Sequence, residues 1–330
     1  MSPFYLRFSC TAHRHTSLYY YTDFKTEVNL FLINICMTTN TLVIGGSGYI
    51  GSALCPQLNT YYTNMDLHWF GGPSPNLKMD FGDITQGFLK NYDTIVLLAG
   101  HSSVAMCDHS LLGSWKNNVT NFINLLECMG DDQVLIYASS GSVYGSNNDT
   151  LCYESMDLPL ESKNYDFTKK AIEKIAMKSD RNTVGLRFGT LNGWSPNTRT
   201  DLMINQMVLT AKTSNGIALT SVENYRSILG INDCVNAINA IIENPKQGNY
   251  IYNLSSLSGN VRSFGTAVKN SLNCNLTIHD EETSRFSFQL DNSRFIEDYN
   301  FVYLDTLQSL IEDLALNSYS HNHRRDAIDY

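Results

Sequence analysis

Short apolar and β-branched runs alternate with longer segments of helical periodicity from residue 41 onward. The short runs predict strands, and apolar positions spaced three and four apart predict helices. Strands are expected at residues 41–45, 61–66, 94–99, 134–138 and 184–188, with a weaker one at 77–79. Helices are expected after residue 49 and at residues 115–129 and 165–178. This alternation predicts an α/β fold with a doubly wound parallel sheet.

The composition changes after residue 189 to a segment rich in Asn, Ser, Thr and Pro, which predicts a loop that leaves the sheet. We expect residues 37–190 to form the sheet domain and residues 191–330 to form a smaller C-terminal α/β lobe over its ligand-binding edge, and a crossing of the chain between the two lobes is left open. The lobe is expected to hold helices at 202–212, 234–242 and 304–314, strands at 227–231 and 250–254, and a tail from about residue 317. Residues 1–36 are expected to be a disordered extension or an artefact of the gene start.

Composition narrows the class of protein. Hydrophobic residues make up 43% and charged residues 17%, as in ordinary globular domains. A net charge of -9 disfavours nucleic-acid binding, and no apolar run is long enough to span a membrane. The eight cysteines are scattered without a Cys-x-x-Cys pair or a secretory signal, which predicts reduced thiols in the cytoplasm. The histidines and cysteines form no set of four ligands, so no metal site is predicted.

Three glycines follow the first predicted strand, at Gly45, Gly48 and Gly51. Such a turn lets the backbone approach a diphosphate at the start of the next helix and lets that helix pack closely on the strand. Asp66 ends the second predicted strand, where a carboxylate accepts hydrogen bonds from ribose hydroxyls and repels a 2′-phosphate. Together they predict a dinucleotide site that prefers NAD to NADP.

Tyr165 and Lys169 are four residues apart on a predicted helix and therefore share one face. An ammonium near a phenol lowers the pKa of the phenol, which favours Tyr165 as a general base. Ser140 follows a buried strand, in a hydroxyl-rich loop on the ligand side of the sheet. We expect Ser140 to hydrogen-bond the same substrate oxygen that Tyr165 deprotonates, and the order and spacing of the three residues predict a catalytic set.

These segments, with residues 93–104 and Asn118-Val119, occur in the order typical of extended short-chain dehydrogenase/reductases. From residue 41 to about 316 the chain resembles the NAD-dependent epimerase/dehydratase family. The resemblance implies a Rossmann fold with a substrate lobe, NAD as cofactor, and a homodimer formed through the helices at 115–129 and 165–178. It implies cofactor contacts from the following residues: Gly45, Gly48, Tyr49, Ile50, Gly51, Asp66, Asp83, Ile84, Leu98, Ala99, Gly100, Tyr165 and Lys169.

The resemblance also implies a nucleotide-sugar substrate. Arg199 and Arg226 match segments that meet the substrate phosphates, whereas Arg187, beside a strand, is expected to be structural. Many relatives have asparagine where this chain has Thr190, which leaves the usual amide contact open. Thr190, Asn192 and Asn205 are the candidate substrate-binding residues in this part of the chain.

The implied reaction is oxidation of a sugar hydroxyl, with its proton taken by Tyr165 and its hydride by NAD. Family dehydratases carry Asp-Glu at the two positions after the serine, where this chain has Gly141 and Ser142. Without these acids we expect hydride return to the opposite face, that is, epimerisation at C4. A dehydratase, decarboxylase or reductase, and a non-catalytic dinucleotide-binding sensor or scaffold, remain the alternatives.

Overall fold

The computed structural model describes residues 39–69, 72–146, 150–160, 163–279 and 287–317. The chain divides into two units, Met1–Thr39 and Asn40–Tyr330, and every element given below belongs to the second. The expected extension at residues 1–36 lies outside the described residues, as does the tail beyond residue 317.

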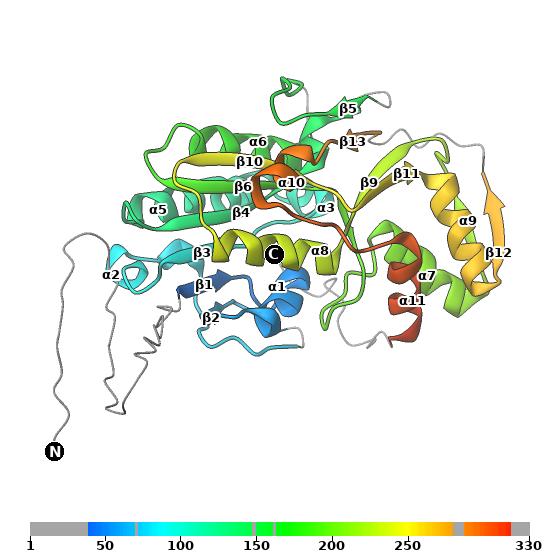
Figure 1. Cartoon of the computed structure of the whole chain (residues 1–330), viewed down its shortest axis with the longest axis horizontal. Coiled ribbons are helices and arrows are strands. Elements are labelled where there is room, and N and C mark those ends of the chain that lie inside the picture. The colour runs from blue at the N-terminus through cyan, green and yellow to red at the C-terminus, as the bar shows by residue number, and fades with distance from the viewer. Residues whose placement is uncertain (1–38, 70–71, 147–149, 161–162, 280–286, 318–330) are drawn as a thin grey trace, which may run out of the picture. The chain divides into compact units, whose positions relative to one another are not determined.

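A parallel sheet of six strands forms the centre of this unit, in the order β10-β6-β4-β3-β1-β2 (Figure 1). In chain order its strands are β1 (Asn40–Ile44), β2 (Tyr61–Met65), β3 (Thr94–Leu97), β4 (Val134–Ser140), β6 (Asn182–Phe188) and β10 (Asn249–Leu254). Val43 of β1 lies opposite Asn64 on one side and Val96 on the other. The doubly wound Rossmann sheet predicted from the sequence is confirmed.

Both faces of the sheet are apolar and covered, because alternate strand residues point to opposite sides. Leu42 and Ile44 share one core cluster with helix residues such as Phe122, whereas Val43 belongs to the cluster on the other face. The helices of the first cluster include α2 (Gln86–Leu89), α5 (Asn121–Cys128) and α6 (Asn164–Ala176). Those of the second are α1 (Tyr49–Leu54), α8 (Ile231–Glu243) and α10 (Ser293–Tyr299).

Two elements expected in the second lobe belong instead to the central sheet. The strand predicted at 250–254 is β10, which pairs in parallel with β6 from Asn249 opposite Thr183 to Leu254 opposite Phe188. The helix predicted at 234–242 is α8, whose apolar side packs under the same sheet with Ile238 completely buried. The chain therefore crosses back after Gly230, and both elements bury their apolar side chains against the central sheet.

Two other predictions need adjustment. The helix predicted at 115–129 is α4 (Leu111–Trp115) followed by a π-helical turn, η3 (Lys116–Thr120), and then α5. The weak strand predicted at 77–79 is only a single bridge between Leu77 and Met65. Short helices also precede and follow the predicted ones, namely η1 (Cys55–Gln57), η2 (Phe81–Asp83), α3 (Val104–His109) and η4 (Gly141–Tyr144).

The second lobe has a core of its own, built on residues such as Val208, Phe264 and Ile311. A three-stranded sheet of β7 (Thr190–Asn192), β9 (Tyr225–Gly230) and β11 (Leu257–Asn260) joins it to the first domain. Its helices are α7 (Met203–Ser214), α9 (Val261–Leu272) and α11 (Leu307–Leu316), and β8 (Gly216–Leu219) pairs with β12 (Asn275–Ile278). A further short pair joins β5 (Leu151–Cys152) to β13 (Gln289–Leu290).

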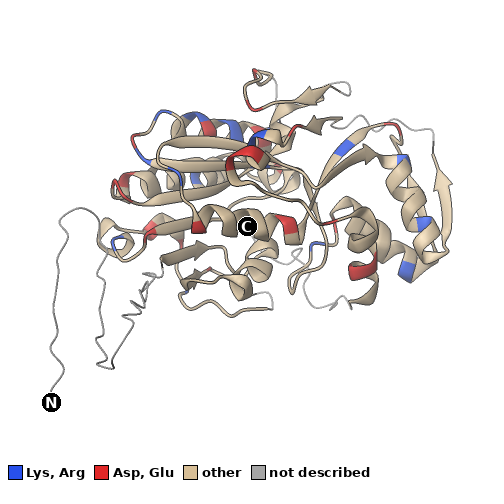
Figure 2. Cartoon of the chain, viewed as in Figure 1, with Lys and Arg blue, Asp and Glu red and all other residues tan. Residues whose placement is uncertain are grey.

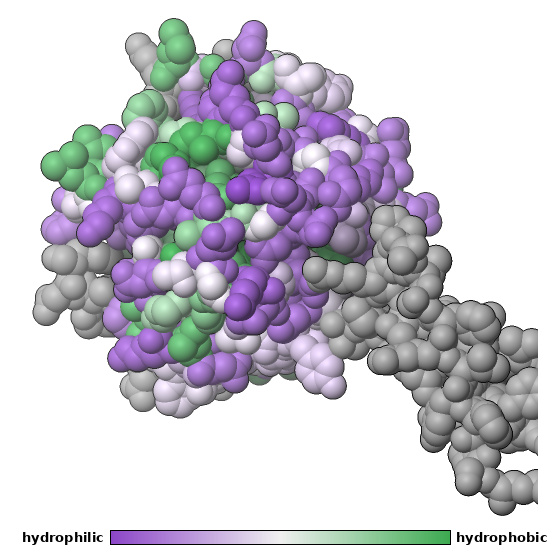
Figure 3. Space-filling model, turned by 90° about the vertical axis from the view of Figure 1, so that its left-hand side faces the viewer, coloured by the Kyte–Doolittle hydropathy of each residue, from purple (hydrophilic) through white to green (hydrophobic). Residues whose placement is uncertain are grey.

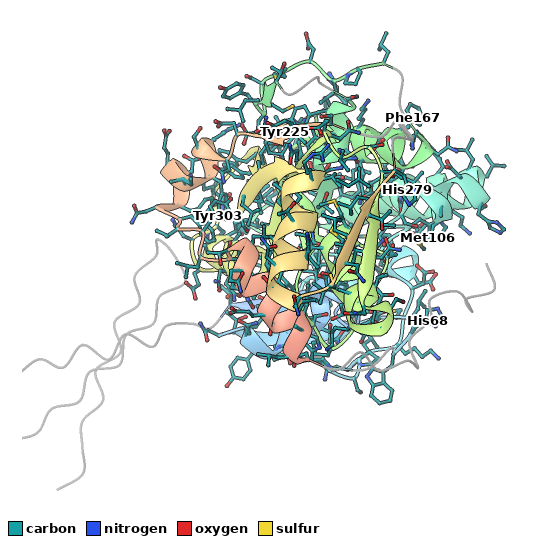
Figure 4. The ribbon with its side chains drawn as sticks, turned by 90° about the vertical axis from the view of Figure 1, so that its right-hand side faces the viewer. His68, Met106, Phe167, Tyr225, His279 and Tyr303 are labelled. Atoms are coloured by element: carbon teal, nitrogen blue, oxygen red, sulfur yellow. The ribbon has the colours of Figure 1, made fainter. Side chains whose placement is uncertain are left out.

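Figure 2 shows that residues of both charges are distributed along the described helices and loops. On the face shown in Figure 3, hydrophobic patches are separated by hydrophilic residues. Figure 4 shows the opposite side, with α9 and β12 of the second lobe toward the viewer. Among the described residues, no helix has the length and hydropathy needed to cross a membrane.

Candidate active site

Helix α6 carries Tyr165 and Lys169 one turn apart, as predicted. The Lys169 ammonium lies 5.7 Å from the centre of the Tyr165 ring and donates a 2.8 Å hydrogen bond to the carbonyl of Ala138 on β4. Lys169 is 7% exposed, and this burial lowers its pKa to about 8. The lysine is therefore fixed to the sheet at the level of the phenol.

Ser140 is the last residue of β4 and lies beside Tyr165. A hydrogen bond with Ser140 and the positive charge of Arg199 lower the pKa of the Tyr165 phenol, but burial outweighs both and raises it to about 12. Lys169, which the sequence predicts to lower this pKa, is itself buried and donates its hydrogen bond to the Ala138 carbonyl.

The glycine turn follows β1 and fits the diphosphate of a dinucleotide. Gly45 has a φ of +87°, and a Cβ placed there would lie 2.6 Å from the backbone nitrogen of Ala99. A Cβ on Gly51 would lie 2.4 Å from the carbonyl oxygen of Gly45. Only glycine is compatible with these positions, so the turn presents bare backbone at the carboxyl edge of the sheet. Gly48 is the N-cap residue of α1, and no side chain caps this end of the helix. Ile50, in the first turn of α1, is partly buried against the core.

Asp66 directly follows β2 and lies against the glycine turn. Its Oδ2 accepts a 3.0 Å hydrogen bond from the backbone N–H of Ser47, and its Oδ1 accepts one from the N–H of His68 at 3.3 Å. Burial raises the pKa of this carboxyl. The structure thus brings the predicted ribose-binding acid and the predicted diphosphate turn together.

The remaining predicted cofactor residues lie around the same edge. Asp83 is exposed at the end of η2, whereas Ile84 is buried in the core. Leu98, Ala99 and Gly100 follow β3, and the first two donate backbone hydrogen bonds to Ile44. Gly100 has a φ of +140°, and a Cβ there would lie 2.8 Å from the side-chain oxygen of Asn118. Asn118 belongs to the π-helical turn, a feature frequent at functional sites.

Arg199 lies on the loop between β7 and α7, and its positive charge acts on Tyr165. Its guanidinium makes a bidentate ion pair with Asp201, with a shortest distance of 2.6 Å, and donates to the carbonyl of Ser102 at 3.3 Å. Its positive charge acts on the phenols of Tyr165 and Tyr49. Arg199 and Arg226 are the two predicted phosphate-binding residues, and the positive charge of Arg199 lowers the pKa of the Tyr165 phenol. Arg226 lies on β9, partly exposed, and donates to the carbonyl of Tyr225 at 2.9 Å.

The structure does not bring Asn192 and Asn205 to an accessible surface, because both are fully buried. The Asn192 oxygen accepts hydrogen bonds from the N–H groups of Ile204 and Asn205, at the start of α7. The Asn205 amide joins Gly193, the Arg199 carbonyl and the phenol of Tyr49. Tyr49 in turn donates to the Gly193 carbonyl at 2.7 Å, so its side chain joins the two domains. Thr190 is partly exposed at the start of β7.

Two features of the site go beyond the sequence predictions. Asp166, which is 1% exposed, accepts a hydrogen bond from the hydroxyl of Ser142. Its place directly after Tyr165 was visible in the sequence, but nothing there indicated where its side chain leads. Arg187 is structural, as expected, and its partner is Glu173 of α6 at 2.7 Å, with both side chains buried.

Metal ligands and disulfides play no visible part in this site. Within the described ranges, no three His, Cys, Asp or Glu side chains come together to hold a metal ion. The described cysteines, from Cys55 to Cys274, are free thiols.

A Rossmann sheet with a glycine turn after β1, an acid after β2, and Ser140, Tyr165 and Lys169 around one edge defines an extended short-chain dehydrogenase/reductase. A sequence profile described as NAD dependent epimerase/dehydratase family matches residues 41–255. The chain belongs to this family, and NAD is accordingly its cofactor.

Epimerases and a dehydratase are among the known proteins that are similar to this chain. UDP-glucose 4-epimerase of Lactobacillus helveticus is 33% identical over 166 residues, which is 46% of this chain and about half, 49%, of that enzyme. A structure of UDP-glucuronic acid 4-epimerase from Bacillus cereus superposes with a TM-score of 0.72 at 20% identity, covering 84% of this chain and 98% of that one. A dTDP-glucose 4,6-dehydratase from Bacillus anthracis str. Ames gives 0.70 at 19% identity, covering 84% and 95%. At these identities, the superpositions establish the fold.

Proposed function

We propose that this protein is an NAD-dependent nucleotide-sugar epimerase. It inverts the configuration of one carbon of the sugar, and we propose C4 as that carbon. The observation that carries the proposal is the meeting of Ser140, Tyr165 and Lys169 at the carboxyl edge of the sheet, beside the glycine turn. The similarity to UDP-sugar epimerases supports the substrate class.

NAD, when bound, supplies a hydride acceptor, and the glycine turn and Asp66 are the residues that would hold its diphosphate and ribose. Tyr165 removes the proton of the sugar hydroxyl as general base. Ser140 holds the phenol oxygen beside the reacting oxygen, and Lys169 adds positive charge near it. Arg199 and Arg226 are proposed to bind the substrate phosphates. Return of the hydride to the opposite face gives the epimer.

Epimerisation is favoured over dehydration because the residues after Ser140 carry no acid of their own. Removal of water across C5 and C6 needs a base for the C5 proton and an acid for the departing hydroxyl. Gly141 and Ser142 supply neither directly, and the Asp166 carboxyl behind Ser142 is buried. The oxidised sugar, which carries a keto group, is therefore expected to take the hydride back and not to lose water.

The first prediction is the outcome of the reaction in heavy water. Purified protein with NAD is screened against UDP-, dTDP- and GDP-sugars, and the best substrate is converted in deuterium oxide and examined by NMR. We expect an inverted sugar without deuterium at C5. A 4-keto-6-deoxy product with deuterium at C5 would show that the enzyme is a dehydratase.

A further inference from the structure

The loop between β7 and α7 is attached to the residues that follow the glycine turn. The Tyr49 phenol, at the start of α1, donates a 2.7 Å hydrogen bond to the carbonyl of Gly193. The side chain of Asn197 donates to the carbonyl of Ser47 at 3.1 Å, and its backbone N–H donates to the hydroxyl of Ser52 at 3.3 Å. These side chains are all buried. The segment expected to meet the cofactor diphosphate therefore also supports this loop of the second lobe.

Asn205, in the first turn of α7, connects this contact to Arg199. Its amide nitrogen donates to the Tyr49 oxygen at 3.2 Å and to the Arg199 carbonyl at 2.8 Å. Its amide oxygen accepts the backbone N–H of Gly193 at 2.9 Å. A side-chain amide has two N–H groups, and these bonds use both of them. The Tyr49 phenol thus supports, from the first domain, the buried amide that holds the backbone of Arg199.

The guanidinium end of Arg199 is held by other partners. It donates to both carboxylate oxygens of Asp201, at 3.0 and 2.6 Å, and to the carbonyl of Ser102 at 3.3 Å. A guanidinium has more N–H groups than these three bonds use, and the Arg199 side chain is 15% exposed. Donors therefore remain for phosphate oxygens, which arginine binds well because of its planar shape and permanent charge.

We propose that Tyr49 and Asn205 are positioning residues for the diphosphate of the substrate, because together they fix the backbone of Arg199. The inference rests on the proposed function, in which Arg199 binds the substrate phosphates. The sequence predicts that Asn205 contacts the substrate itself. Its amide is buried and acts instead through Arg199, and the Tyr49 phenol acts through Asn205.

Removal of the Tyr49 oxygen disturbs two buried groups at once. The Gly193 carbonyl loses the phenol as donor, and one N–H of Asn205 loses the phenol as acceptor. A buried polar group without a partner is costly, so the Asn205 amide is expected to turn and release the Arg199 carbonyl. An arginine that is no longer held in place must be ordered when it binds a phosphate. The affinity for the phosphate therefore falls.

A purely structural role for Tyr49 makes a different prediction. If the phenol only joined the two domains, its loss would weaken nucleotide binding by the same factor whether or not Arg199 is present. Positioning through Arg199 instead requires the two residues to act as one unit, so that the second substitution adds nothing to the first. A double-mutant cycle on nucleotide binding distinguishes the two roles.

The second prediction compares Tyr49→Phe, Arg199→Gln and the double variant, each in the full chain with NAD present. UDP, dTDP and GDP are titrated by isothermal calorimetry, and the nucleotide that the wild-type protein binds most tightly is used throughout. We expect Tyr49→Phe to weaken its binding by at least about fivefold and Arg199→Gln by at least about tenfold. The double variant should bind no more weakly than Arg199→Gln alone.

Tyr92→Phe is the matched control for the loss of a buried phenol oxygen. Tyr92 is 9% exposed, and its phenol donates a 3.1 Å hydrogen bond to Thr63 within the first domain. Its loss disturbs that domain without touching the loop between β7 and α7, so nucleotide binding should stay within about twofold of the wild type. Asn205→Ala breaks the same support from the side of α7, and the same cycle with Arg199→Gln tests it independently.

Two results would overturn the positioning role while leaving the proposed function intact. One is a Tyr49→Phe protein whose nucleotide affinity lies within about twofold of the Tyr92→Phe control. The other is a double variant in which the losses from Tyr49→Phe and Arg199→Gln multiply. A wild-type protein that binds none of the three nucleotides would instead overturn the proposed function, and this inference with it.

Discussion

At the scale of single residues, local spacing predicted that Tyr165 and Lys169 lie side by side. The residues around this pair are brought there by tertiary contacts. Tyr165 and Lys169 meet because an i, i+4 pair shares a helix face whatever the rest of the chain does. The contact between Asp166 and Ser142 joins residues from two elements, and no spacing in the sequence encodes it. Asn192 and Asn205 are amides of the expected type, but both are buried and bond to groups inside the protein, namely backbone groups and, for Asn205, also the phenol of Tyr49.

The third prediction concerns the phenol oxygen of Tyr165. Tyr165→Phe removes only the group that exchanges a proton with the substrate, so we expect a loss of turnover of about a hundred- to ten-thousandfold, with the melting temperature and NAD affinity retained. Tyr153→Phe is the matched control, because Tyr153 is 46% exposed and lies outside the proposed catalytic set. A loss below threefold at Tyr165 would exclude it as the base.

At the scale of elements, the hydrophobic pattern predicted which segments form strands and helices. It was less successful in predicting whether each segment belongs to the central sheet or to the substrate lobe. The segments that form α8 and β10 were recognised, yet they were expected in the substrate lobe. A buried strand has the same pattern in either sheet, and the crossing at Gly230 depends on pairing with β6, more than sixty residues earlier in the chain. The pattern of α4 and α5 likewise did not reveal the π-helical turn between them.

One buried ion pair joins α6 to β6. Arg187 of β6 makes two hydrogen bonds to Glu173 of α6, at 2.9 and 2.7 Å, and Ser139 of β4 donates to the same carboxylate at 2.5 Å. Arg187 also donates to the phenol of Tyr144 at 2.7 Å. This network fixes the helix that carries Tyr165 and Lys169 against the sheet.

The fourth prediction is that Glu173→Gln lowers the free energy of unfolding by about 3–5 kcal/mol, because it leaves the buried guanidinium charge without a counter-charge. Glu223→Gln is the control, since Glu223 is 71% exposed in its ion pair with Arg262 and should cost no more than about 1 kcal/mol. Urea unfolding followed by circular dichroism measures both. Equal losses in the two variants would mean that the Arg187–Glu173 pair contributes little.

At the scale of the whole molecule, apolar side chains gather on the outer side of α4 and α6. Leu111 and Leu112 on α4 are 47% and 83% exposed, and Phe167 on α6 is 50% exposed. Phe167 packs on Trp115 with ring centres 5.4 Å apart, so the two helices meet through apolar side chains. Phe167 and Met106 of the neighbouring α3 lie toward the same edge of the molecule in Figure 4. Exposed apolar surface of this kind is typical of protein–protein interfaces.

The fifth prediction is that the exposed apolar side chains of α4 and α6 belong to the interface of a homodimer. The resemblance to the family implied an interface formed by the helices at 115–129 and 165–178. Light scattering after gel filtration should give twice the chain mass of 37.1 kDa for the wild-type protein at micromolar concentration. Leu112→Glu places a charge at the most exposed of these apolar positions, so it should shift the equilibrium toward the monomer while the circular dichroism spectrum stays unchanged. Leu304→Glu is the matched control, because Leu304 is 70% exposed in the segment before α11, away from α4 and α6 in sequence and in fold. A wild-type monomer, or a dimer that Leu112→Glu leaves intact, would contradict the interface.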